Sequence, residues 1–214
     1  AIIGSTGSGK TALVGLIPRF YDVQEGEVLV DGVNVKDYDR KTLRKKIGYV
    51  PQKALLFKGT IMENIRFGDD SASDERVKEA AAIAQSTDFI EDKPEGFDSF
   101  IAQGGSNVSG GQRQRLAIAR AIVRKPEIYV FDDSFSALDF KTDSALRQAL
   151  ARETENATVV IVAQRVSTIM NADRIIVMDE GKVMGIGTHR ELLNTCETYQ
   201  EIVRSQLSEE EMSA

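Results

Sequence analysis

The chain has 214 residues, of which 42% are hydrophobic and 28% are charged, and its formal net charge is −6. This composition is ordinary for a globular protein and suits one sizeable α/β domain or a core with a subdomain. No stripe of Lys and Arg stands out, which argues against a nucleic-acid surface. The single cysteine, Cys196, rules out an internal disulfide. No apolar run approaches the ~20 residues that a membrane-spanning helix needs.

The first element is a glycine-rich segment, GSTGSGKT from Gly4 to Thr11, preceded only by AII. Since such a loop should follow a whole buried strand, we expect the natural protein to extend upstream. A helix should follow, with an apolar face made by Leu13, Leu16, Ile17 and Phe20. Pro18 is expected to end or bend this helix.

The next segments predict a hairpin, a strand and then a helical region. Asp31-Gly32 lies between EVLV and VNV, and this dipeptide tolerates the positive φ angles of a type I′ turn. Residues 47–50 (IGYV) read as a short buried strand. From about residue 60 to 124 the pattern is helical, with one helix at 74–86 and another at 113–124. Ser109 and Gln112 have capping-box spacing ahead of the second helix.

Strands and helices alternate again after Pro126. Strands are predicted at 128–131, 158–163 and 174–178, and a helix at 141–153. Continuous apolar runs of this kind are typical of a parallel sheet covered on both faces. The turn Glu180-Gly181 leads into a last short strand, a C-terminal helix follows from about Arg190, and the tail 208–214 is expected to be disordered.

GSTGSGKT matches the pattern G-x-x-x-x-G-K-[ST], which predicts ATP binding. Its glycines let successive backbone N–H groups point at phosphate oxygens, and a following helix adds its positive end. Lys10 would neutralise the β- and γ-phosphates, and the Thr11 hydroxyl would hold Mg²⁺. A chance glycine-rich turn is disfavoured by the helical pattern that follows at once. The predicted nucleotide-binding residues here are Gly4, Ser5, Thr6, Gly7, Ser8, Gly9, Lys10, Thr11 and Ala12.

Mg²⁺ needs a second anchor, usually an Asp at the end of an apolar strand. Asp132 in IYVFDD follows four apolar residues and fits that role. Such an Asp is often only a helix cap or a turn former, but its pairing with the glycine loop favours the metal role.

At NVSGGQRQR the sequence reaches a resemblance to a known family. Ser109, Gly110, Gly111 and Gln112 resemble the signature of ATP-binding cassette (ABC) proteins. The glycine loop, Gln52 in YVPQ, Asp132 and the turn at 136–139 occur in that family's order, so the likeness covers nearly the whole chain. SGGQ alone could be a plain helix N-cap.

The resemblance implies an α/β fold, a P-loop NTPase (RecA-like) parallel-sheet core with an inserted α-helical subdomain. The core would occupy 1–59 and 125–189, with its first strands missing upstream, the helical subdomain 60–124, and the C-terminal helix and acidic tail 190–214. It also implies a head-to-tail dimer in which the signature serves the ATP of a second such domain. Gln52 would touch Mg²⁺ and relay the nucleotide state to a membrane part.

FKGTIMENIRFG and RFYDVQEGEVLVDG resemble the exporter branch of the family. Exporters of this type carry membrane-spanning helices ahead of the ATP-binding domain in the same full-length protein. The resemblance therefore implies a multidrug- or lipid-type efflux function at the cytoplasmic face of the cell membrane. It implies no nucleic-acid partner.

Two positions depart from the family pattern. Asp133 stands where the family usually has Glu, the presumed general base, and Asp is one methylene shorter. Gln164 stands where the family usually has His, and it cannot become a cation that stabilises transition-state charge. The only histidine, His189, lies elsewhere and is expected at the surface near a helix start. Because Lys10 and the other binding residues are intact, the chain resembles the degenerate-site subunit of a heterodimeric multidrug exporter.

Two alternatives stay open, and a third is disfavoured. The protein could be a homodimeric exporter in which Asp133 works as the base, or a regulatory module that binds ATP and never hydrolyses it. DNA-repair ATPases of the same superfamily are disfavoured because they insert long coiled coils, and no sustained heptads occur here.

Overall fold

The structure of the chain is a computed structural model that describes residues 1–206. The chain forms two compact units, and each is described by itself. Unit 1 comprises residues Ala1–Leu43 and the chain from Val160 onward, and unit 2 comprises Arg44–Val159. The boundaries of the predicted helical subdomain, residues 60 and 124, stay a prediction. The predicted disordered tail, 208–214, lies outside the described residues.

The strands of unit 1 form a mostly parallel arrangement around β1 (Ile2–Gly4). β1 pairs in parallel with β8 (Thr158–Val162) on one side and with β9 (Ile175–Asp179) on the other. β10 (Lys182–Gly187) closes this edge antiparallel to β9, with a register shift in the middle of the strand. The observed strands confirm the predicted mixed α/β class, and β8 and β9 match their predicted ranges to within one residue at each end.

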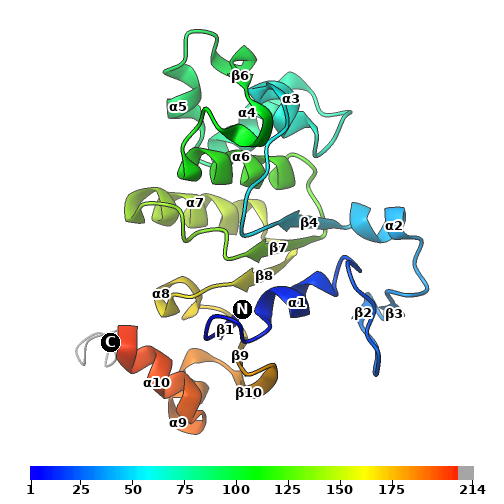
Figure 1. Ribbon diagram of the computed structural model, residues 1–214, viewed down its shortest axis with the longest axis vertical. Coiled ribbons are helices and arrows are strands. Elements are labelled where there is room, and N and C mark those ends of the chain that lie inside the picture. The colour runs from blue at the N-terminus through cyan, green and yellow to red at the C-terminus, as the bar shows by residue number, and fades with distance from the viewer. Residues whose placement is uncertain (207–214) are drawn as a thin grey trace. The chain divides into compact units, whose positions relative to one another are not determined.

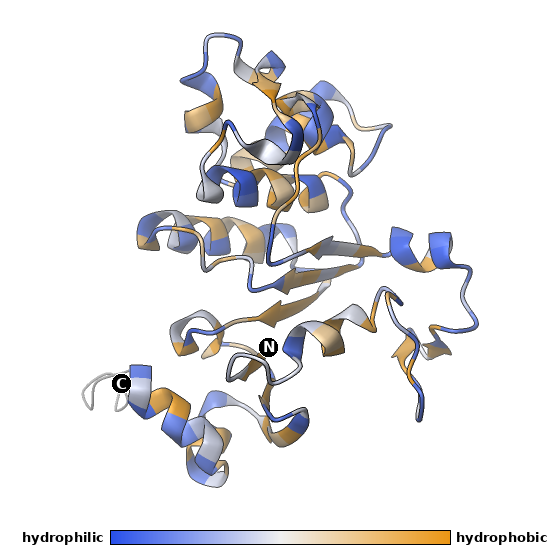
Figure 2. Ribbon diagram, in the orientation of Figure 1, coloured by the Kyte–Doolittle hydropathy of each residue, from blue (hydrophilic) through white to orange (hydrophobic). Residues whose placement is uncertain are grey.

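The core of unit 1 lies between these strands and the C-terminal helices α8 (Val166–Ile169), α9 (His189–Thr195) and α10 (Glu197–Gln206). Figure 1 shows α9 and α10 side by side in orange and red. Apolar residues of β1 and β9 pack with those of the helices in one cluster: Ile3, Val166, Ile169, Ile175, Val177, Leu192, Cys196, Tyr199 and Val203. The strands of this unit are among the hydrophobic segments in Figure 2.

The C-terminal segment differs from the single helix predicted from about Arg190. It forms two helices, because the backbone at Cys196 is extended, with φ −127° and ψ 103°. Cys196 is buried between them rather than inside a helix. His189 is the first residue of α9, as expected, but it is half-buried and its Nδ1 lies 2.7 Å from the hydroxyl of Tyr199. The pKa of His189 is lowered, mainly because the imidazole is partly buried.

The N-terminal half of unit 1 confirms the predicted hairpin. β2 (Leu29–Val30) pairs antiparallel with β3 (Val33–Asn34), and the turn residues Asp31 and Gly32 have φ of 51° and 77°. Positive φ at both positions is what a type I′ turn requires.

The helix after the glycine loop is shorter than predicted. α1 spans Lys10–Gly15 and ends before Pro18, since a proline disfavours helical backbone at the residue ahead of it. Phe20 was expected on the buried face of this helix, but it lies beyond the helix and is 48% exposed.

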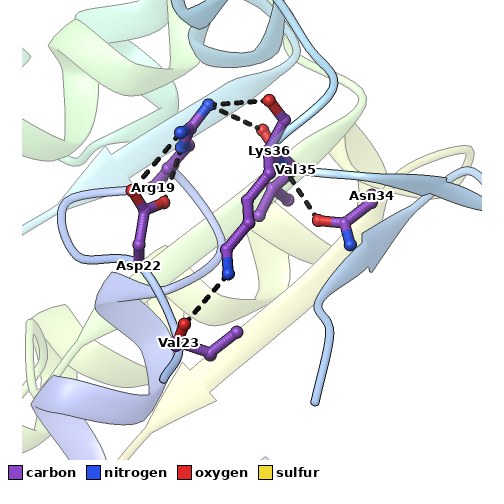
Figure 3. A network of polar contacts seen from close by, with 6 residues as sticks. All are labelled: Arg19, Asp22, Val23, Asn34, Val35 and Lys36. Atoms are coloured by element: carbon purple, nitrogen blue, oxygen red, sulfur yellow. Dashed lines mark hydrogen bonds and ion pairs between the residues drawn. The ribbon is translucent and has the colours of Figure 1, made fainter. Parts of the chain in front are cut away.

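A polar network ties the segment after α1 to the hairpin (Figure 3). The Arg19 guanidinium donates to the Asp22 carboxylate at 2.7 Å and to the Lys36 carbonyl at 3.0 Å. The Lys36 ammonium donates in turn to the Val23 carbonyl at 3.0 Å. The hydrogen bond from Arg19 lowers the pKa of Asp22. These contacts link the stretch RFYDVQ, part of the segment that resembles the exporter branch, to the residues that follow the hairpin.

Unit 2 is built on β4 (Ile47–Val50), which runs parallel to β7 (Ile128–Asp132). The α-helices that lie wholly in this unit are α3 (Ile61–Arg66), α4 (Asp74–Ile83), α5 (Thr87–Glu91), α6 (Gly110–Ile122) and α7 (Phe140–Glu153). The unit also contains the short strand pair β5 (Gly59–Thr60) and β6 (Phe100–Ile101) and two 3-10 helices, η1 (Gly96–Asp98) and η2 (Gln103–Gly105). α2 (Arg40–Lys45) joins the two units along the chain. Helices α3, α4 and α6 pack on one another, and α6 also contacts β4.

Helix starts in unit 2 follow local capping chemistry. Ser109 caps α6 through the predicted capping box, since its hydroxyl accepts from the backbone N–H of Gln112 and the Gln112 side chain accepts from the N–H of Ser109. The helix begins at Gly110, three residues earlier than predicted, because the cap and not the apolar pattern sets its start. Ser73 caps α4 through a single bond, since its hydroxyl accepts from the Arg76 N–H, and α4 ends at Ile83 rather than at 86.

Asn64 fixes the entry to the helices of unit 2. It is 2% exposed, and its amide donates to the carbonyls of Phe57 and Thr60 at 2.8 and 3.0 Å. Its oxygen accepts from the Phe57 N–H at 2.9 Å and from Arg120 at 3.0 Å. A buried amide is stable when each of its polar atoms has a hydrogen bond, as those of Asn64 do.

Within residues 1–206, no helix is both long and apolar enough to cross a membrane.

Gly68 supplies a stability test for this packing. A Cβ at Gly68 would lie 2.0 Å from the backbone oxygen of Arg120, so α6 would have to shift. Gly68→Ala is expected to lower the free energy of unfolding by about 1–3 kcal/mol, measured by urea denaturation. The control is Gly110→Ala, where the nearest atom to the added Cβ is 3.9 Å away. Equal stability of the two variants would contradict the tight contact.

Candidate functional site

The predicted phosphate loop begins where β1 ends in unit 1. Gly4 pairs with Met178 of β9, and a Cβ at Gly4 would lie 2.0 Å from the Met178 backbone oxygen. No larger residue fits at this point without moving the strand. Gly7 and Gly9 have φ of 84° and 95°, in the left-handed region that glycine adopts at little cost. The loop conformation therefore depends on three of its glycines, for two different reasons.

Lys10 lies inside the curve of its own loop. It is 9% exposed, and its ammonium donates to the backbone oxygens of Gly4 and Ser5 at 2.8 and 2.7 Å and to the Ser8 hydroxyl at 3.3 Å. These oxygens compensate the cost of burying a cation. The loop thus holds a positive charge at its centre, which is the electrostatic requirement for binding phosphate.

The turn between β9 and β10 supports the loop from outside. The Ser5 hydroxyl donates to the Asp179 carboxylate at 3.0 Å, and the Gly181 N–H donates to the Ser8 carbonyl at 3.2 Å. Asp179 was not among the predicted site residues. The available signal was a carboxylate at the end of an apolar strand, the same pattern that singled out Asp132.

Gln164 is at the same end of the unit 1 strands as the loop. Ile2 pairs with Val162 in a parallel ladder, and Gly4 and Gln164 each lie two residues beyond this pair on their own segments. Parallel strands bring such positions to one edge. Gln164 is exposed, and its backbone oxygen accepts from the Gln206 side chain at 2.7 Å. The strand pairing therefore places Gln164 and the start of the phosphate loop at one strand edge, and the role of Gln164 there stays a prediction.

The two acids of the site lie at the end of β7 in unit 2. Asp132 is 2% exposed, and one of its carboxylate oxygens, Oδ2, accepts from the Tyr49 hydroxyl at 3.1 Å. Asp133 is 8% exposed and has φ 48°, an uncommon backbone conformation for a residue other than glycine. Its Oδ2 accepts from the Gln52 side-chain amide at 3.0 Å. Tyr49 was not predicted to take part, because its contact spans 83 residues.

The predicted metal ligands fit Mg²⁺ by their chemistry. Asp132 supplies a carboxylate, Thr11 a hydroxyl and Gln52 an amide oxygen, and oxygen ligands with one or two carboxylates are what Mg²⁺ takes in phosphate-binding sites. The Gln52 nitrogen faces Asp133, so its carbonyl oxygen is the end suited to a cation. In residues 1–206, no group of three or more His, Cys, Asp or Glu side chains could form a dedicated metal cage.

The signature residues stand at the exposed start of α6. Ser109 and Gly110 are exposed, while Gly111 and Gln112 are half-buried. The capping box uses the Ser109 oxygen and the Gln112 N–H, whereas the N–H groups of Gly110 and Gly111 belong to the first turn and have no acceptor within the helix. This geometry suits an anion held from outside the chain.

The predicted site residues thus form two sets. Unit 1 carries the phosphate loop and Gln164, and unit 2 carries Gln52, Asp132, Asp133 and the signature. In unit 1, Gly4 and Gln164 lie at one strand edge. In unit 2, Gln52 contacts Asp133 after the end of β7, whereas the signature stands at the start of α6.

A separate groove of about 230 Å³ opens on unit 2 beside α3 and α6. Its lining includes Leu55, Phe57, Phe67 and Arg120. The Arg120 guanidinium lies over the rings of Phe57 and Phe67, at 5.0 and 5.7 Å from their centroids. Burial lowers the pKa of Arg120 to about 10. Its hydrogen-bond partners are oxygens of Asn64 and Leu55, and none in the described part of the chain is a carboxylate.

Comparisons with known proteins identify the family of the chain. Residues 1–136 match the ABC transporter family. An uncharacterized ABC transporter ATP-binding protein of Mycobacterium bovis is 49% identical over 209 residues, 96% of this chain and 36% of the relative. A Staphylococcus aureus protein, provisionally named a multidrug export ATP-binding/permease protein, is 44% identical over 202 residues, 94% of this chain and 35% of the relative. The chain thus spans about a third of the length of these relatives.

The fold has a close counterpart among solved structures. A bacterial Atm1-family ABC exporter with ATP bound matches with a TM-score of 0.94 at 38% identity, over 97% of this chain and 37% of that chain. The family match covers well over half of the chain, and the relatives cover nearly all of it. The chain therefore belongs to the ABC transporter family, as a P-loop ATPase domain of that family.

Proposed function

We propose that this chain is the ATP-binding domain of an exporter and couples ATP binding and hydrolysis to efflux of multidrug- or lipid-type substrates. The observation that carries the proposal is the buried Lys10 ammonium inside a glycine loop whose shape leaves no room for a side chain at Gly4. The relatives named as ABC transporter and export proteins support the transport role. The domain would work at the cytoplasmic face of the membrane.

In this proposal Lys10 and the loop N–H groups bind the phosphates, and Thr11, Gln52 and Asp132 hold Mg²⁺. The cation neutralises charge on the β- and γ-phosphates when it is bound. Asp133 stands where a base would act on the attacking water. Gln164 would contact the γ-phosphate from the strand edge that it shares with the loop.

Hydrolysis at this chain's own site is proposed to be slow. Asp133 carries a short side chain, and one of its carboxylate oxygens already accepts the Gln52 amide. A base has to lie within about 2.6–3.2 Å of the proton that it removes, and a side chain one methylene shorter reaches less far. Gln164 can donate a hydrogen bond to a phosphate oxygen but adds no positive charge in the transition state.

The partner is proposed to be an unlike ABC domain that brings its own complete catalytic residues. The signature of this chain, Ser109 with the N–H groups of Gly110 and Gly111, would then complete the partner's site. A heterodimer would explain why this chain combines an intact signature with weakened catalytic residues at its own ATP site.

The groove on unit 2 is proposed to receive the transmembrane part of the same full-length protein. The relatives are about three times as long as this chain, so they contain a large further part. Arg120, a half-buried cation with no carboxylate partner among the described residues, favours an acidic group on the segment that docks. Leu55 and Phe67, which are 54% and 61% exposed, offer that segment an apolar rim.

The first test concerns the own site. Asp133→Glu combined with Gln164→His is expected to raise ATP turnover at this site by about tenfold or more, because a placed general base contributes roughly 10²–10⁴ in rate. Turnover is measured in the assembled exporter with the partner's site inactivated. Adding Lys10→Ala should abolish the gain. An unchanged rate in a folded double variant would mean that another feature silences the site. Robust turnover by the unaltered chain alone would instead favour a homodimeric exporter.

The second test concerns the signature. Ser109→Ala is expected to slow ATP hydrolysis at the partner's site while leaving nucleotide affinity at this chain's loop unchanged. Removing the cap costs about 1 kcal/mol of helix stability. Ser73→Ala is therefore the matched control, since Ser73 caps α4 through the equivalent bond. If both variants slow the partner equally, the effect is one of stability. If neither slows it, the signature does not serve the partner's site.

The third test concerns the groove. Leu55→Ser is expected to weaken coupling to the transmembrane part, seen as loss of substrate-stimulated ATP turnover in reconstituted full-length protein with basal turnover kept. Burying a leucine contributes about 1.5–3 kcal/mol, so association should weaken by about tenfold or more. Leu29→Ser is the control, because Leu29 is similarly exposed, at 52% against 54%, but lies on β2 of unit 1. Equal behaviour of both variants would argue against docking at this groove.

A further inference from the structure

Tyr49 stands one strand away from Asp132 and has been given no role so far. In the parallel ladder of β4 and β7, Tyr49 is paired with Val130. Side chains alternate along a strand, so Tyr49, Val130 and Asp132 project from the same face of this strand pair. A tyrosine is long enough to reach the next position on that face diagonally. Its hydroxyl lies 3.1 Å from Oδ2 of Asp132.

We propose that Tyr49 is a positioning residue for the metal-binding carboxylate of Asp132. This inference rests on the proposed function, in which Asp132 holds Mg²⁺. The hydroxyl donates to one carboxylate oxygen and so fixes the rotation of the group about its Cβ–Cγ bond. The carboxylate is then oriented before a cation arrives, and the cation does not have to order it on binding. Partners that orient a metal ligand in this way typically change metal affinity by about 10–100-fold when they are removed.

Burial makes this bond hard to replace. Asp132 is 2% exposed, so water has little access to the position that the Tyr49 hydroxyl occupies. A hydrogen bond to a charged group contributes more than a neutral one. When such a bond to a buried acceptor is lost, water does not replace it, and the full free-energy cost remains. The phenol is therefore suited to hold the carboxylate in place, and a surface side chain at this position would not do so.

The end of β4 gives one donor to each of the two adjacent acids. Tyr49 donates to Asp132, and Gln52, three residues later, donates to Asp133. The two donors differ in what they can do next. The Gln52 side chain is exposed and can change rotamer, whereas Tyr49 is half-buried in the strand and keeps its place. Tyr49 is thus the fixed element of the pair.

The test uses Tyr49→Phe, which keeps the ring and removes the donor, in the full-length protein. Mn²⁺ replaces Mg²⁺ as the probe, and its binding to the ADP-loaded protein is followed by electron paramagnetic resonance. The apparent Kd for Mn²⁺ is expected to rise about tenfold or more. The affinity for ADP in EDTA is expected to stay within error of the unaltered protein.

The matched control is Tyr38→Phe, because the Tyr38 hydroxyl donates at the same distance of 3.1 Å, but to the Val30 carbonyl of the hairpin. It should leave the Mn²⁺ affinity unchanged. If Tyr49→Phe does not fold, 3-fluorotyrosine at position 49 keeps the shape and makes the hydroxyl a stronger donor. Its Mn²⁺ affinity should then equal or exceed that of the unaltered protein, and weaker binding would count against the proposal.

Asp132→Asn separates this inference from the function on which it rests. If Asp132→Asn leaves the Mn²⁺ affinity unchanged, the proposed metal role of Asp132 fails, and Tyr49 has no metal ligand to position. If Asp132→Asn weakens Mn²⁺ binding and Tyr49→Phe does not, only the role of Tyr49 is overturned. An equal loss of ADP affinity in EDTA for Tyr49→Phe would show a general structural role and would also overturn it.

Discussion

The parallel pairing of β4 with β7 is the constraint on which the chemistry of unit 2 depends. Its register sets Tyr49 beside Val130 and so decides which side chains of β4 can reach the acids that follow β7. A slip of one residue would turn Tyr49 to the other face and remove its hydrogen bond to Asp132. The same principle operates in unit 1, where the pairing of Gly4 with Met178 excludes any side chain from the start of the phosphate loop.

Features set by neighbouring residues were predictable from the sequence. The Asp31-Gly32 hairpin, the strand at 47–50 and the capping box at Ser109 are confirmed because each depends on residues at most a few positions apart. Element ends were less predictable, as the break at Cys196 and the early end of α1 show. Contacts between distant residues gave no local signal. The bonds from Tyr49 to Asp132 and from Gln52 to Asp133 each span more than 80 residues, and they depend on strand pairing that no short pattern specifies.

The two departures from the family pattern act on different physical quantities. In the proposed mechanism, Asp133 would shorten the reach of the general base, and Gln164 would remove positive charge beside a developing phosphate anion. Neither alters the loop that binds the phosphates, where Gly4 and Lys10 are held by packing and by backbone oxygens. Binding and turnover are therefore separable in this fold, which is the physical basis for proposing that nucleotide stays bound here while a partner hydrolyses.

The position of Lys10 has a consequence for the strength of phosphate binding. The ammonium is surrounded by the backbone oxygens of Gly4 and Ser5 and by the Ser8 hydroxyl, which are the same kind of ligand that a phosphate offers. Phosphate binding is then an exchange of one oxygen shell for another, with little change in the desolvation of the cation. Because these loop oxygens belong to the same chain, they compete with a phosphate for the ammonium at a constant effective concentration. The strength of phosphate binding should therefore depend on the geometry of these loop oxygens as well as on the charge of the lysine.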